Sequence, residues 1–90
     1  MTPPVWRLST TTRFDREFAK LDSTVQRRIA AELEAMIRLP DPRTRGKSLT
    51  GDLHGYWRYR FGDYRVIVDI RDGELCIIAL TVGHRSKVYR

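Results

Sequence analysis

The sequence predicts an α+β fold, in which a short N-terminal strand and a pair of helices precede a three-stranded antiparallel meander, with both helices on one face of the sheet. Two patterns predict it. Apolar residues recur every three to four positions between residues 12 and 37, the spacing of amphipathic helices. From residue 56 onward, apolar and polar residues alternate, interrupted by glycine-containing turn pairs. Because 90 residues suffice for one hydrophobic core, we expect a single domain over residues 1–90.

The N-terminal half contains the predicted strand and the helical hairpin. Val5–Ser9 alternates apolar and polar residues as a strand does, and the pairs Thr12–Asp15 and Ser23–Gln26 fit two capping boxes that open helices. The prolines of Pro40–Pro42 end the second helix, and the short linker between the helices favours an αα-hairpin. The predicted buried stripe of the second helix consists of Val25, Ile29, Leu33, Met36 and Ile37.

The C-terminal half contains the predicted meander. Tyr56–Phe61 and Tyr64–Ile70 flank Gly62-Asp63, a two-residue turn signal with glycine where a type II′ turn needs it. Asp72-Gly73 is a second hairpin signal, followed by a third strand over Glu74–Val82. Because loop length fixes strand register, these turns predict which side chains are neighbours.

The first predicted turn gathers three arginines on one face of the sheet. With Gly62-Asp63 as the loop, Arg60 lies opposite Arg65, and Arg58 lies opposite Ile67. The alternating aromatic residues then face the helices. Like charges directly opposite across a ladder destabilise it by roughly 0.2–1 kcal/mol, so we expect an anion to bind on the arginine face.

The second predicted turn gives this face an apolar floor. With Asp72-Gly73 as the loop, Arg65 faces Leu80. A groove with an apolar floor and a cationic rim suits both a docking peptide and phosphate. The floor is predicted to consist of Ile67, Ile78 and Leu80.

Composition narrows the class of partner. The 17 basic residues exceed the 11 acidic ones, and only Lys20, Lys47 and Lys87 are lysines. Since arginine favours bidentate phosphate contacts, nucleic acid is the leading predicted partner and an acidic protein the second. The longest apolar run, Leu75–Val82, is too short to span a bilayer, and the N-terminus does not resemble a signal peptide, so we expect a cytoplasmic protein. We expect no metal, because no His, Cys or carboxylate spacing reads as a metal site, and we expect Cys76 to be a buried free thiol.

Four segments in this order resemble the RelE/ParE toxin superfamily, and within it the RelE type. They are Pro40–Pro42, Gly46–Arg60, Gly62–Ile67 and Val82–Tyr89, and the resemblance extends over nearly the whole chain. It implies the toxin of a type II toxin–antitoxin pair, a ribosome-dependent endoribonuclease that cleaves mRNA in the A site of the 70S ribosome. In that reaction the 2′-hydroxyl attacks the adjacent phosphate, and no cofactor is required. The implied partners are a cognate antitoxin, mRNA, ribosomal RNA and, through the antitoxin, operator DNA.

The resemblance also implies roles for individual residues. Arg60 and Arg65 would hold the scissile phosphate, Arg85 would balance charge on the leaving oxygen, and Tyr89 would stack on a base or orient the 2′-hydroxyl. The implied catalytic set is Arg60, Arg65, His84, Arg85 and Tyr89. Implied RNA contacts are Lys47, Arg58, Lys87 and Arg90, and implied antitoxin contacts are Ile67, Ile78 and Leu80.

The sequence leaves two questions open. The RelE pattern has lysines where Arg58 and Arg60 stand, and because arginine does not release its proton, the candidate general bases are His84 and Tyr89. His84 is equally a turn residue at a strand end. As to function, the rivals are a ParE-like poison of DNA gyrase without nuclease activity and a binding module that only docks an antitoxin or operator DNA. Arg65 in combination with Arg85 and Tyr89 favours the RelE type.

Overall fold

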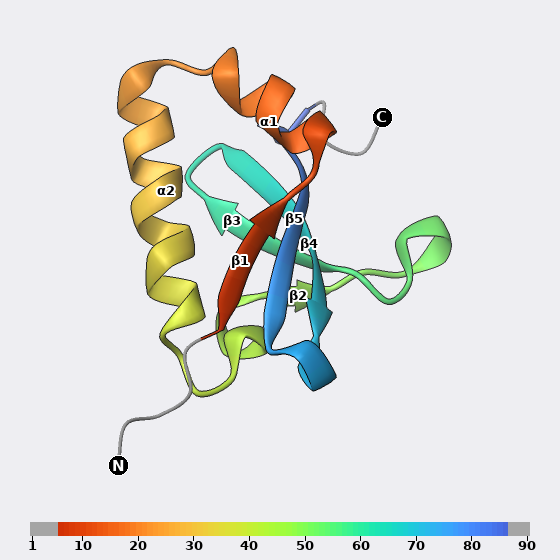
Figure 1. The fold of residues 1–90 in the computed structure, drawn as a ribbon. Helices are drawn as coiled ribbons and strands as arrows, with labels where there is room; N and C mark the ends of the chain where they lie inside the picture. The colour runs from red at the N-terminus through yellow and green to blue at the C-terminus, as the bar shows by residue number, and fades with distance from the viewer. Residues whose placement is uncertain (1–5, 87–90) are drawn as a thin grey trace.

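A computed structural model describes residues 6–86 and contains two helices and a five-stranded sheet (Figure 1). Three short 3₁₀ turns, Pro42–Arg45, Gly51–Leu53 and Asp72–Glu74, lie in the connections. In the described range, no helix has the length and apolar character needed to cross a membrane. The main elements are β1 (Arg7–Thr10), α1 (Thr12–Ala19), α2 (Ser23–Ile37), β2 (Lys47–Ser48), β3 (Trp57–Phe61), β4 (Tyr64–Arg71) and β5 (Cys76–His84).

The predicted fold class is confirmed. The strand order is β1-β5-β4-β3-β2, with β1 parallel to β5 and the remaining neighbours antiparallel. The α1–α2 hairpin packs on one face of the sheet (Figure 1). The two-residue strand β2 was not predicted, because it lies in the polar connection and too few of its residues pair to leave an alternation in the sequence.

The hydrophobic core lies between α2 and the helix-facing side of the sheet. The predicted stripe of α2 is confirmed: three of its residues are fully buried, and Val25 and Ile37 pack at its margins. Full burial of a large aliphatic side chain contributes roughly 1.5–3 kcal/mol, so this stripe is the main reason that α2 is helical in this position. The buried stripe residues are Ile29, Leu33 and Met36, and the facing strand residues include Tyr59, Phe61, Val66, Val68, Ile77 and Ala79.

Both helices begin one residue earlier than the capping boxes predicted. Thr11 is the N-cap of α1, and its hydroxyl accepts a hydrogen bond from the backbone N–H of Phe14 at 3.0 Å. Asp22 is the N-cap position of α2, without a side-chain capping bond. Gln26 instead donates its amide to the carbonyl of Phe18, at 2.8 Å, which joins the two helices. A run of threonines and an Asp-Ser pair each offer two adjacent cap residues, so the sequence alone does not select between them.

The first hairpin register is confirmed and the second is corrected. Gly62 adopts φ +63°, and Arg60 pairs with Arg65 as predicted. The second connection spans residues 72–75 rather than two residues, because a 3₁₀ turn begins at Asp72 and ends at Leu75 in the left-handed region, with φ 48°. Arg71 therefore pairs with Cys76, and the third meander strand is Cys76–His84 instead of Glu74–Val82.

A β-bulge changes the register again further along the same ladder. Val68 pairs with Ala79, whereas Ile67 pairs with Thr81, so Leu80 is the extra residue. Beyond the bulge Arg65 pairs with Gly83, and the predicted pairing of Arg65 with Leu80 is wrong. An inserted residue shifts every following pair by one and exchanges the two faces of the strand.

Candidate nucleic-acid interface

Four basic residues on β2, β3 and the first part of β4 lie close together on the sheet face that points away from the helices. Arg60 lies directly opposite Arg65, and Arg58 lies opposite Ile67. Strand β2 adds Lys47, which pairs with Arg58. Paired residues project to the same side of an antiparallel ladder, so Lys47, Arg58, Arg60 and Arg65 form one surface, hereafter the cationic face. No strand was predicted at Lys47, and β2 brings this residue beside the predicted arginine trio.

The charges of Arg60 and Arg65 are not compensated by acids within residues 6–86. None of the ion pairs in this range involves either residue. Arg65 is half-buried, and its Nη1 atom is buried without a hydrogen-bond acceptor among the described residues. A buried donor without an acceptor costs about 1–3 kcal/mol, and the facing arginine adds repulsion. An anionic oxygen at this position would offset both costs.

A packed segment behind the sheet fixes the position of β2. Pro42 is fully buried, and its carbonyl accepts a hydrogen bond of 2.9 Å from the hydroxyl of Tyr59. Burial raises the pKa of Tyr59 to about 12. Gly46 packs so closely on the Tyr59 ring that an added Cβ would lie 2.8 Å from Cε1. Because Gly46 directly precedes Lys47, these contacts place β2 against β3.

Arg43 connects the 3₁₀ turn Pro42–Arg45 to the β4–β5 connection. Its guanidinium donates two hydrogen bonds, of 2.8 and 2.6 Å, to the carboxylate of Asp72 in the β4–β5 connection. It also lies 5.6 Å from the ring centroid of Trp57. The hydrogen bond from Arg43 lowers the pKa of Asp72. Trp57 thus lies against the Arg43 guanidinium on one side and packs on the core.

Two predicted catalytic residues, His84 at the end of β5 and Arg85 directly after it, are directed to opposite faces of the sheet. Tyr64 pairs with His84, and the backbone N–H of Arg85 donates to the carbonyl of Asp63 at 2.8 Å. Gly83 pairs with Arg65, so alternation directs Arg85 toward the cationic face and His84 toward the helical face. The strand register therefore directs Arg85, but not His84, toward the side of the sheet that carries the arginine trio.

His84 has its own set of contacts on the helical face. Its ring meets the Tyr64 ring edge-on, with centroids 5.8 Å apart. Its Nδ1 accepts a hydrogen bond from the backbone N–H of Ser86 at 3.3 Å and lies 3.0 Å from the Ser86 hydroxyl. These contacts correspond to the interpretation of His84 as a turn residue at a strand end.

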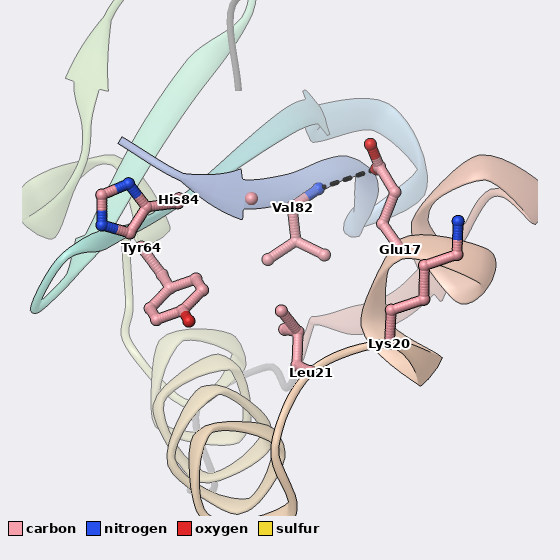
Figure 2. Close-up of a pocket in the computed structure, with 7 residues that line it drawn as sticks. Glu17, Lys20, Leu21, Tyr64, Val82 and His84 are labelled. Atoms are coloured by element: carbon pink, nitrogen blue, oxygen red, sulfur yellow. Dashed lines mark hydrogen bonds between the residues drawn. The ribbon is translucent and has the colours of Figure 1, made fainter. Parts of the chain in front are cut away.

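A pocket of about 340 Å³ opens beside His84, and no sequence pattern indicated it (Figure 2). Its walls come from the α1–α2 corner and from the ends of β4 and β5, segments far apart in the sequence. Glu17 lies at one end of the pocket and is hydrogen-bonded to β5. The lining residues are Glu17, Lys20, Leu21, Tyr64, Val82, Gly83 and His84.

The predicted apolar floor is altered by the bulge. Ile67 lies on the cationic face but is almost completely buried, and Ile78 is half-buried on the same side. Leu80 is the extra residue of the bulge and not the partner of Arg65. The exposed part of the floor is therefore smaller than the predicted trio.

Three predicted site residues, Lys87, Tyr89 and Arg90, lie outside the described residues. Within residues 6–86, no group of three or more His, Cys, Asp or Glu side chains could hold a metal ion. Cys76 is a buried free thiol, as predicted.

The fold and the cationic face define a small α+β domain with a basic sheet surface. A family model described as the ParE toxin of the type II toxin–antitoxin system matches residues 8–89. The chain therefore belongs to this toxin family.

Individual relatives of the chain carry the RelE name. The chain is 40% identical over 52 residues to toxin RelE of Mycobacterium tuberculosis, covering 58% of this chain and 54% of the relative, so it spans about half the length of that curated protein. It is also similar to a chain of the toxin–antitoxin complex RelBE2 from the same organism, with a TM-score of 0.77 and 29% identity over 91% of this chain and 100% of the other. For a chain of the archaeal RelE–RelB complex from Pyrococcus horikoshii OT3, the TM-score is 0.73, with 25% identity over 94% of this chain and 100% of the other.

Proposed function

We propose that the chain is the toxin of a type II toxin–antitoxin pair and that it cleaves mRNA in the A site of the 70S ribosome without a metal or other cofactor. The observation that carries this proposal is the uncompensated Arg60–Arg65 pair, with a buried guanidinium donor that lacks an acceptor among the described residues. A phosphate is the anion whose geometry and charge fit such a pair. Because its proposed substrate is ribosome-bound mRNA, the toxin would act in the cytoplasm.

In the proposed reaction the 2′-hydroxyl attacks the adjacent phosphorus, which leaves a cyclic phosphate and a free 5′-hydroxyl. Arg60 and Arg65 donate hydrogen bonds to the non-bridging oxygens, where charge accumulates in the transition state. Arg85 balances the charge that develops on the leaving oxygen. Stabilisation by fixed donors of this kind accounts for about 10²–10³ in rate per donor.

The remaining cations bind the strand rather than the reacting atoms. Lys47 and Arg58 extend the cationic face beyond the reactive pair and would contact neighbouring phosphates. We assign the same role to Lys87 and Arg90. Of the two candidate general bases, His84 projects to the other face of the sheet. We therefore assign the removal of the 2′-hydroxyl proton to Tyr89.

The cognate antitoxin is proposed to cover the cationic face with an acidic or amphipathic segment. Such a segment would neutralise Arg60 and Arg65 and contact Ile78 and Leu80 beside them, above the buried Ile67. The solved relatives from Mycobacterium tuberculosis and Pyrococcus horikoshii are toxin–antitoxin complexes, which supports a partner of this kind. Through the antitoxin, the pair would bind operator DNA.

The test is a cell-free translation reaction with purified protein, followed by primer extension on the message. We expect ribosome-dependent breaks within codons for the wild type and their loss in Arg65→Ala. Arg71→Ala is the matched control, since Arg71 is exposed and its guanidinium is already paired with Asp69 at 3.0 Å. Intact message with the wild-type protein would overturn the proposal.

A second candidate function is poisoning of DNA gyrase. It is favoured by the name of the matching family model and by the position of His84 away from the arginines. In this case the wild type would inhibit purified gyrase in a supercoiling assay, and Arg65→Ala would inhibit it equally. The message in the translation reaction would stay intact.

A further inference from the structure

The bulge at Leu80 determines whether His84, the last residue of β5, or Arg85, which directly follows it, projects toward the cationic face. Before the bulge, Val68 pairs with Ala79, and continuing that register would pair Arg65 with Val82. His84 would then share the face of Arg65, and Arg85 would point toward the helices. The inserted residue exchanges these positions and also brings Val82 into the core, where it is 2% exposed.

Thr11, the N-cap of α1, is hydrogen-bonded to the bulge. The Thr11 hydroxyl accepts a hydrogen bond from the N–H of Phe14, as the helix cap, and donates one of 2.7 Å to the carbonyl of Leu80. The backbone N–H of Thr11 donates to the carbonyl of Ala79 at 3.1 Å. A single side chain thus joins the N-terminus of α1 to the irregular step in the ladder.

Glu17, in the second turn of α1, is hydrogen-bonded to Thr81 and Val82, the two β5 residues that follow Leu80. Its Oε1 atom accepts a hydrogen bond of 2.5 Å from the Thr81 hydroxyl. The same atom accepts one of 3.1 Å from the backbone N–H of Val82, which is the bond drawn in Figure 2. Strand β1 ends at Thr10, whose partner is Ala79, so this stretch of β5 lies past the end of the parallel ladder. The Glu17 carboxylate takes the place of a neighbouring strand at that edge.

We propose that Glu17, together with Thr11, is a positioning residue that holds the bulge and so directs Arg85 toward the scissile phosphate. This inference rests on the proposed function for the role of Arg85, but the structural effect of Glu17 is independent of it. Glu17 itself lies on the helical side and acts only through β5.

The first arm of the test measures structure in the full chain by NMR. In Glu17→Ala, we expect the Val82 amide to exchange with solvent about tenfold to hundredfold faster relative to that of Val66, the range expected for losing a hydrogen bond to a charged acceptor. The ring-proton shifts of His84 should also lose the contribution of the Tyr64 ring. Glu17→Gln should retain most of the protection, because its amide oxygen can accept the same two bonds. Glu34→Gln, on the exposed side of α2, is the control. Unchanged Val82 exchange in Glu17→Ala would overturn the proposal.

The second arm is a double-mutant cycle on single-turnover cleavage of ribosome-bound message. Glu17→Ala should lower the rate at saturation by about a hundredfold, as misplacement of a catalytic group by about 1 Å does, with little change in the half-saturating concentration. The double variant Glu17→Ala/Arg85→Ala should be no slower than Arg85→Ala alone. Additive losses would overturn the role of Glu17 in placing Arg85. If the wild type does not cleave, the proposed function fails, and the NMR arm still decides whether Glu17 holds the bulge.

Discussion

Replacing Arg65 by methionine should stabilise the free protein while removing its activity. Methionine keeps the unbranched apolar stem that packs at this half-buried position but lacks the guanidinium. Two destabilising contributions then disappear, namely the repulsion across the Arg60–Arg65 pair and the buried Nη1 donor without an acceptor among residues 6–86.

The expected gain follows from these two contributions. Cross-strand repulsion is worth roughly 0.2–1 kcal/mol, and a buried donor without an acceptor about 1–3 kcal/mol. Because the guanidinium also makes favourable packing contacts, we expect a net gain of about 1–3 kcal/mol in the free energy of unfolding. In a domain of this size each 1 kcal/mol raises Tm by about 4–8 °C.

Thermal and urea unfolding of the wild type, Arg65→Met and Arg71→Met would measure this gain. Arg71→Met serves as control, because Arg71 is exposed and paired with Asp69, so its change should stay within about 0.5 kcal/mol. Added sulfate should raise the Tm of the wild type more than that of Arg65→Met, since only the wild type has the anion site. An Arg65→Met protein that unfolds at or below the wild-type temperature, with the same response to sulfate, would show that the pair is not a strained anion site.

Three other substitutions test the supports of the site. Gly46→Ala should lower the free energy of unfolding by about 1–3 kcal/mol in urea titrations, because its Cβ would lie 2.8 Å from the buried Tyr59 ring; unchanged stability would contradict this packing. The folded-state pKa of Tyr59, about 12, is above the ordinary value of 10.0, so its stabilisation is complete below pH 10 and is lost as pH rises through 12. Absorbance at 295 nm should therefore show Tyr59 ionising together with unfolding, and Tyr59→Phe should flatten the alkaline transition. His84→Gln should leave the shape of the pH–rate profile of cleavage unchanged, because His84 projects away from the cationic face, whereas loss of a limb from that profile would make His84 the general base.

Local sequence signals predicted the elements whose geometry is decided by neighbouring residues. The Gly62-Asp63 turn is such a case, because a two-residue loop with glycine at positive φ admits one register, and the Arg60–Arg65 pairing follows from it. The stripe of α2 is another, since helical periodicity alone selects the residues that face the sheet.

Features that depend on distant contacts were not predictable in this way. A turn does begin at Asp72, as predicted. It continues to Leu75, however, and leucine rarely adopts the left-handed region. The bulge at Leu80 is held by Thr11 and Glu17, more than 60 residues away in the chain, so no local pattern indicates it. The faces toward which His84 and Arg85 are directed depend on the bulge, so the role of His84 could not be decided from the sequence.

The chemical ends of the broken message report on the phosphate-binding role of the cationic face. Message-programmed ribosomes would be incubated with the wild type, Arg65→Ala and the control Arg71→Ala, and the fragments labelled with polynucleotide kinase without prior phosphatase treatment. We expect 5′-hydroxyl ends, and hence labelling, with the wild type and Arg71→Ala. With Arg65→Ala we expect at least a hundredfold less labelling, in line with the roughly 10²–10³ in rate per donor at such sites. Equal labelling with Arg65→Ala, or an intact message beside inhibited gyrase, would contradict it.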